Sequence, residues 1–109
     1  MSALQSYVDA MREGNAQKAA ALFSEDALFN DEAPRAVGMD PLVARGREAI
    51  QELFSRLVAN GGLRIESVCI CRNAMRYDVV VTEDMVVKTL GVATEEGGLI
   101  TEYQVRAVI

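Results

Sequence analysis

Histidine and tryptophan are both absent from this chain of 109 residues. Without histidine there can be no Ser-His-Asp or Cys-His nucleophilic site, no histidine-rich metal site and no imidazole proton carrier at neutral pH. Acid–base chemistry must therefore use carboxylates, tyrosine, lysine or cysteine in environments that shift their pKa values. The two cysteines cannot fill a tetrahedral zinc site, and we expect neither a metal ion nor another cofactor.

Long hydrophobic runs and clusters of positive charge are also lacking. No apolar run approaches the roughly 18 residues of a membrane helix, and no signal-peptide pattern opens the chain. The net charge is −5, so we expect neither a nucleic acid nor a membrane as partner. The length and the 50% hydrophobic content are typical of a single globular domain that spans residues 1–109.

The two cysteines, Cys69 and Cys71, are separated by one residue in a predicted strand, so both side chains point to one face. Their Cα atoms would lie about 6.6 Å apart with parallel side-chain vectors, which is poor geometry for a disulfide. We interpret them as small buried hydrophobic residues. Free thiols are typical of a reducing compartment, and we expect a cytoplasmic protein.

The first half of the chain predicts three helices. Ser2 and Gln5 form a capping box, and Gly14 ends the first helix. Asn15 can cap a second, short helix. A long helix follows over about 47–59, with an apolar stripe made of Ile50, Leu53, Phe54, Leu57 and Val58.

From residue 63 onwards the hydrophobic period becomes two, which is typical of β-strands. The pattern predicts strands over about 63–72, 75–82, 85–93 and 99–108, after a short earlier strand at 27–30. The connecting turns are short, so neighbouring strands must be antiparallel. Helices followed by an antiparallel sheet indicate an α+β fold. Both sheet faces are partly apolar, which favours a homodimer through one of them.

The least regular stretch is 31–45, which contains Pro34, Gly38 and Pro41. Residues 25–40 carry five acids and one arginine. This stretch is either a solvated loop or a rim or lid over a site, because functional groups favour loops on a rigid scaffold.

Four segments, spread over nearly the whole chain, have a recognisable character: YVDA at 7–10, AALFSEDA at 20–27, GREAI at 46–50 and EGGLIT at 96–101. In these segments and in the order of its elements the chain resembles the NTF2-like superfamily, which includes SnoaL-like proteins, ketosteroid isomerases and limonene epoxide hydrolases. The resemblance implies a curved sheet wrapped around the long helix as a cone, with an apolar pocket at its open end, in a homodimer. One such scaffold carries enzymes, binding proteins and adaptors.

The ketosteroid isomerase pattern matches two residues. Tyr7 falls on the tyrosine that donates to the developing oxyanion, and Asp31 on the aspartate that shuttles the proton. The second oxyanion donor of that family, a protonated aspartic acid in a dry site, is replaced by Leu90. Loss of one oxyanion donor typically lowers the rate by about 10²–10³.

The limonene epoxide hydrolase pattern is also half matched. Arg76 and Asp78 match its Arg-x-Asp strand motif, and their spacing puts both side chains on one face. The second aspartate of that family falls on Val105, and its Tyr/Asn pair on Phe29 and Asp31. We infer that Asp31 could replace the missing carboxylate. A register slip of one residue near 75–93 would turn Arg76 and Asp78 away from the pocket.

The resulting hypothesis is a protein that binds, and converts, a small apolar or amphipathic molecule. Asp31 would be the general acid or base, with Tyr7 as hydrogen-bond donor or Arg76 and Asp78 as an oriented ion pair. We expect four side chains to line the pocket: Phe29, Phe54, Leu90 and Val105.

Three structural alternatives remain for the proposed catalytic residues: an exposed Asx turn at Asp31, a packing role for Tyr7, and an exposed cross-strand pair for Arg76 and Asp78. The alternative functions are a non-catalytic carrier or sensor and a dimerisation module whose cavity is filled by side chains.

Overall fold

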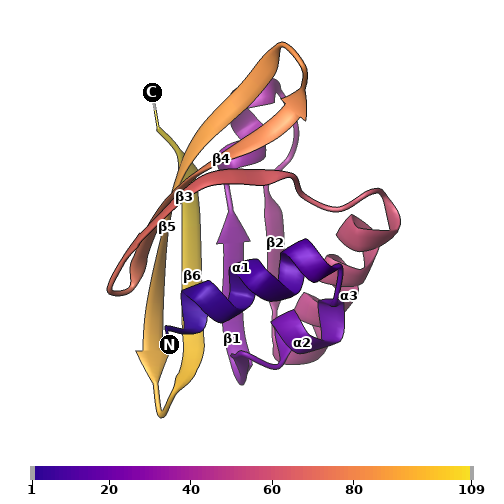
Figure 1. Ribbon diagram of the computed structural model, residues 1–109. Coiled ribbons are helices and arrows are strands. Elements are labelled where there is room, and N and C mark those ends of the chain that lie inside the picture. The colour runs from indigo at the N-terminus through magenta and orange to yellow at the C-terminus, as the bar shows by residue number, and fades with distance from the viewer. Residues whose placement is uncertain (1, 109) are drawn as a thin grey trace.

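The computed structural model describes residues 2–108. Three α-helices lie on one side of a curved sheet (Figure 1): α1 (Ala3–Glu13), α2 (Ala16–Ala20) and α3 (Arg47–Ala59). A short 3-10 helix, η1 (Ala33–Val37), lies at the upper end of the sheet in that view. The three predicted α-helices are therefore confirmed.

The two predicted N-caps are formed, but the Gln5 side chain donates to Asp9 Oδ1 at 3.0 Å instead of completing the capping box with Ser2. The Ser2 hydroxyl oxygen accepts from the Gln5 N–H at 3.2 Å, and Asn15 Oδ1 accepts from the Lys18 N–H at 3.0 Å. Gly14 ends α1 with a φ of 73°, a left-handed conformation that glycine adopts without strain. These caps place the beginnings of α1 and α2, and the end of α1, where the sequence predicts them.

The sheet has six strands in the order β2-β1-β6-β5-β4-β3. Their bounds are β1 (Phe23–Asp31), β2 (Leu42–Arg45), β3 (Ile65–Cys71), β4 (Ala74–Thr82), β5 (Met85–Glu96) and β6 (Leu99–Ala107). The α+β class is confirmed, and two details differ from the prediction. β2 is a strand within the stretch expected to be irregular, and β1 pairs with β6 in parallel, so the sheet is mixed rather than wholly antiparallel.

All six aromatic residues of the chain are buried. Five of them contact one another with ring centroids 5.2–6.2 Å apart: Tyr7, Phe23, Phe29, Phe54 and Tyr103. We call these five residues the aromatic cluster. They come from α1, β1, α3 and β6, so the cluster joins the helices to the sheet. Pairs of this kind contribute about 0.5–1.5 kcal/mol each beyond the area they bury.

The face of the sheet opposite the helices is exposed to solvent in the strands of the second half of the chain. Cys69 and Cys71 share this face as expected, but both are exposed, so their interpretation as buried residues is wrong. Their neighbours Val68 and Ile70 are half-buried and point toward the core instead. All four side chains are apolar or nearly so, and alternation alone does not distinguish the two faces.

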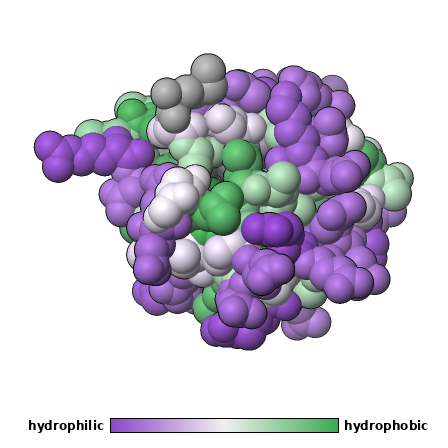
Figure 2. Space-filling view, turned by 90° about the horizontal axis from the view of Figure 1, so that it is seen from below, coloured by the Kyte–Doolittle hydropathy of each residue, from purple (hydrophilic) through white to green (hydrophobic). Residues whose placement is uncertain are grey.

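No helix in the described part of the chain is long and apolar enough to cross a membrane. Seen from below, the surface is mostly hydrophilic around a smaller hydrophobic area (Figure 2).

Candidate functional site

A cavity of about 430 Å³ lies where η1, the C-terminal end of α3 and the β4–β5 hairpin meet. Its walls are mainly aliphatic and include Val37, Leu42, Leu57, Leu63, Val79 and Val87. The polar side chains that line it are Asp31, Asp40, Asn60 and Arg64. The cavity is thus an apolar space with few polar groups, as is typical of small-molecule sites.

Asp31 is brought to this cavity by the end of β1. Its backbone pairs with Leu42 of β2 on one side and with Val105 of β6 on the other. Its Oδ1 accepts the Ala33 N–H at 2.9 Å, which fixes the first turn of η1. The expected Asx turn is therefore present, but Asp31 is only 7% exposed and is not a solvated loop residue.

The Asp31 carboxyl group is poorly compensated. Burial raises its pKa above the ordinary value of 3.8, and the hydrogen bond from Ala33 opposes this shift. Within residues 2–108, no lysine or arginine lies within salt-bridge distance of it. A desolvated carboxyl group beside a cavity, without a counter-ion, is characteristic of functional sites.

All three tyrosines of the chain interact electrostatically with Asp31. Burial raises the pKa of Tyr7, Tyr77 and Tyr103, and the negative charge of Asp31 raises each further. None of the three lines the cavity. They are therefore buried close enough to Asp31 to interact with its charge, but they do not line the cavity.

The Tyr103 hydroxyl group is buried without a satisfied hydrogen-bond partner among the described residues. It interacts with the Tyr77 hydroxyl, but without the geometry of a full hydrogen bond. The ring lies over Gly91, where a Cβ atom would be 2.7 Å from Tyr103 Cζ. Gly91 is thus required by the close approach of an aromatic ring to the backbone of β5.

Arg76, Asp78 and Leu90 lie on the outward face of the sheet, away from Asp31. Arg76 is exposed and pairs in register with Leu90, which is itself 37% exposed. Between Arg76 and Asp78, the buried Tyr77 points inward. The structure therefore does not bring these three residues into the cavity, because strand alternation gives the inward positions to their neighbours.

Phe29, Phe54 and Val105 are fully buried and lie in the core rather than on the cavity wall. Phe29 and Phe54 are 5.2 Å apart within the aromatic cluster. Their expected contact with a ligand is therefore replaced by packing beneath the cavity. Asp31 is the one predicted site residue that lines it.

Tyr77 and Tyr103 were not predicted as site residues. A signal existed for both, because each alternates with charged or polar neighbours in a strand and so had to face inward. The cavity-lining valines of β4 and β5 were also missed, since a ligand wall and a core wall have the same sequence pattern.

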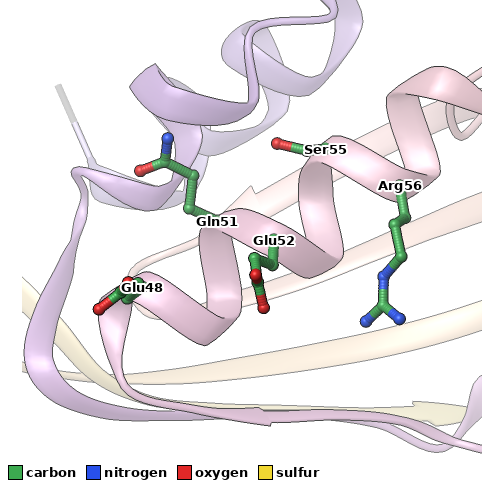
Figure 3. A pocket seen from close by; sticks show the side chains of 5 residues that line it. All are labelled: Glu48, Gln51, Glu52, Ser55 and Arg56. Atoms are coloured by element: carbon green, nitrogen blue, oxygen red, sulfur yellow. The ribbon is translucent and has the colours of Figure 1, made fainter.

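Two other depressions lie on the surface around α3. One is lined by five side chains of this helix alone, Glu48, Gln51, Glu52, Ser55 and Arg56 (Figure 3). These polar groups project from one helix face, and no second element encloses them. Within the described residues, no group of three or more metal-ligating side chains is present.

Comparison with known proteins agrees with this architecture. The model of the SnoaL-like domain family matches residues 4–107. A search of curated proteins finds no match. Among solved structures, an NTF2-like protein of unknown function from Mesorhizobium loti has a TM-score of 0.74 at 14% identity, and covers 98% of this chain and 88% of its own.

Two further structures share the fold. A protein from Sphaerobacter thermophilus has a TM-score of 0.75 at 16% identity, with 98% of this chain and 94% of that chain covered. A protein of ketosteroid isomerase-like fold from Catenulispora acidiphila, solved in complex with trimethylamine, has a TM-score of 0.66 at 19% identity, with 94% and 82% covered. The family model spans almost the entire chain, and the protein belongs to the SnoaL-like domain family and shares its fold with NTF2-like proteins.

Proposed function

We propose that the protein binds a small, mostly apolar molecule in the 430 Å³ cavity, with Asp31 as the polar contact. The observation that carries this proposal is the position of Asp31, a buried carboxyl group without a counter-ion at the wall of an aliphatic cavity. A protein gains nothing in stability from such a group, because a desolvated charge costs free energy. The small molecule bound by the neighbour of similar fold also supports a small-molecule site.

We further propose that Asp31 transfers a proton to or from the bound molecule. Its raised pKa brings the carboxyl group closer to neutral pH, where a general acid or base is most effective. Tyr7 lies behind Asp31 and is a positioning residue in this scheme, since it does not line the cavity. Leu90 and Val105 are apolar and supply neither a second oxyanion donor nor a second carboxylate.

The test is a screen of small apolar molecules by two-dimensional NMR, followed by turnover assays on those that bind, with enones and epoxides included. The wild-type protein is compared with Asp31→Asn and with Glu52→Gln, an exposed control on α3. We expect ligands to shift the resonances of Val79 and Val87. Turnover that is unchanged in Asp31→Asn would refute the proton-transfer role.

A non-catalytic carrier or sensor is the alternative at the same cavity. It predicts a molecule that stabilises the protein and is recovered chemically unchanged after incubation. The filled-cavity module is less well supported, because the aromatic cluster fills the interior but leaves the cavity beside Asp31 open. It predicts that no small molecule shifts any cavity resonance.

A homodimer through the outward sheet face is a second proposal. Exposed Leu90 and Val92 lie on this face beside charges of both signs, since Asp78 pairs in register with Lys88. A face with apolar and oppositely charged groups can complement a second copy of itself about a two-fold axis. Sedimentation should therefore give a dimer that Leu90→Glu converts to a monomer, whereas Glu52→Gln leaves it intact. A monomeric wild-type protein would contradict the proposal.

A further inference from the structure

The polar groups of the cavity are biased toward acids. Of its four polar side chains, Asp31 and Asp40 are carboxylates, Asn60 is neutral and Arg64 is the single cation of the lining. The Arg64 side chain is 70% exposed, and its Nη2 lies 3.3 Å from Glu66 Oε1 outside the cavity. The positive charge of the lining is thus already paired and directed toward solvent.

Asp31 is the buried polar side chain of the lining, whereas Asp40, Asn60 and Arg64 are exposed. One carboxylate oxygen accepts from Ala33, which leaves further acceptor positions on the group. A ligand carbonyl or anion would need a hydrogen-bond donor. The hydroxyl groups of Tyr7, Tyr77 and Tyr103 could donate, but they do not line the cavity. An ionised Asp31 can only accept hydrogen bonds, so its partner has to be a donor.

The surrounding charge acts in the same direction. Two of the three charged side chains in the lining are acids, Asp31 and Asp40, and the third is the Arg64 already paired with Glu66. An excess of negative charge in the lining of an apolar cavity attracts cations and repels carboxylates and phosphates. In the partly desolvated cavity, this preference is stronger than it would be on an open surface.

From this arrangement we infer that the ligand is an apolar molecule with a basic nitrogen, whose ammonium group donates a hydrogen bond to the Asp31 carboxylate while its hydrocarbon part packs on the valine and leucine walls. This inference rests on the proposed function and narrows its ligand class. An ammonium–carboxylate contact is both an ion pair and a hydrogen bond, and is about twice as strong as a neutral one. It would also supply the counter-ion that Asp31 lacks.

Three probes of nearly equal size separate the effect of charge from that of shape: benzylamine, benzyl alcohol and benzoate. Their dissociation constants are measured at about pH 8 by NMR titration of the Val79 and Val87 resonances, where benzylamine is protonated and an ordinary carboxyl group is ionised. The variants are Asp31→Asn, which retains the shape and an acceptor for Ala33, and Glu52→Gln as an exposed control on α3 outside the cavity. Hexylamine and hexanol repeat the comparison with a flexible chain.

In the wild-type protein we expect benzylamine to bind at least tenfold more tightly than benzyl alcohol, and benzoate to bind most weakly. Asp31→Asn should reduce the ratio of amine affinity to alcohol affinity to near one, while Glu52→Gln changes it little. Equal binding of amine and alcohol, or a ratio that survives in Asp31→Asn, would overturn the inference and leave the apolar cavity intact as a binding site. If neither amines nor alcohols shift the two valines, the proposed function fails together with it.

Discussion

Replacing Tyr103 by phenylalanine removes one oxygen atom from the centre of the protein, and we expect the variant to be more stable than the wild type. The Tyr103 hydroxyl is buried with no satisfied partner among residues 2–108. Its ring is held by Phe29 at 5.7 Å and Tyr7 at 5.5 Å, measured between centroids, so phenylalanine should occupy the same place. The substitution then removes a desolvation cost and leaves the ring contacts unchanged.

The size of the effect follows from the cost of an unpaired buried hydroxyl group, about 1–3 kcal/mol. Part of this gain is lost because the missing oxygen leaves a small void above Gly91. We therefore expect Tyr103→Phe to raise the free energy of unfolding by about 1 kcal/mol. For a domain of this length, that corresponds to roughly 4–6 °C in Tm. Since the chain has no tryptophan, urea and thermal unfolding are followed by far-ultraviolet circular dichroism.

The matched control is Tyr77→Phe. Its hydroxyl interacts with that of Thr89, and its loss should cost about 0.5–1.5 kcal/mol. Opposite signs for the two variants would support an unpaired Tyr103 hydroxyl. A decrease in stability of Tyr103→Phe by 1 kcal/mol or more would refute the reasoning, because the oxygen would then have a partner that stabilises the fold.

Three further predictions concern neighbouring features. Gly91→Ala should lower the free energy of unfolding by about 1–3 kcal/mol, since its Cβ would lie 2.7 Å from Tyr103 Cζ; an unchanged urea midpoint would show that the ring can move aside. Asp31 has a raised pKa, so the folded state binds its proton more tightly and wild-type stability falls as pH rises from 3.8 through the raised value. Asp31→Asn should not show this loss, so its free energy of unfolding should rise relative to that of the wild type across that pH range in urea titrations. A difference between the two proteins that stays constant with pH would contradict this prediction. Ser2→Ala should cost about 1 kcal/mol through loss of the α1 cap, and equal Tm values would argue against that cap.

The fold could be predicted where local signals decide it. Ser2, Asn15 and Gly14 fix the helix ends by their own side chains or backbone freedom, and the period of two after residue 63 identifies the strands. The parallel pairing of β1 with β6 could not be read in this way. It joins segments about seventy residues apart, and no turn of fixed length constrains them.

The site was predictable in part for the same reason. Asp31 follows a strand directly into an irregular, acidic stretch, and that position proved to line the cavity. Arg76 and Asp78 face outward because of the strand register, and a slip of one residue would turn both side chains to the other face of the sheet. The irregularity of β3 between Glu66 and Cys69 is another such case, since it includes Ser67 at a φ of 54° and interrupts the alternation that would assign the cysteine face.

The groups of the interior that destabilise the fold lie close together, and their proximity is relevant to function. Asp31, Val105 and Gly91 are register partners along one row of the sheet, and the Tyr103 ring lies over Gly91. The row and the ring above it thus hold a carboxyl group without a counter-ion, a glycine within a strand and a hydroxyl group without a satisfied partner, each of which lowers stability. A module whose interior served only to pack would gain from an apolar residue in place of Asp31 and from phenylalanine in place of Tyr103. Asp31 lines the cavity, and Gly91 and Tyr103 lie in the core beside it. Destabilising groups next to a cavity support a binding site there, because proteins retain such groups where function requires them.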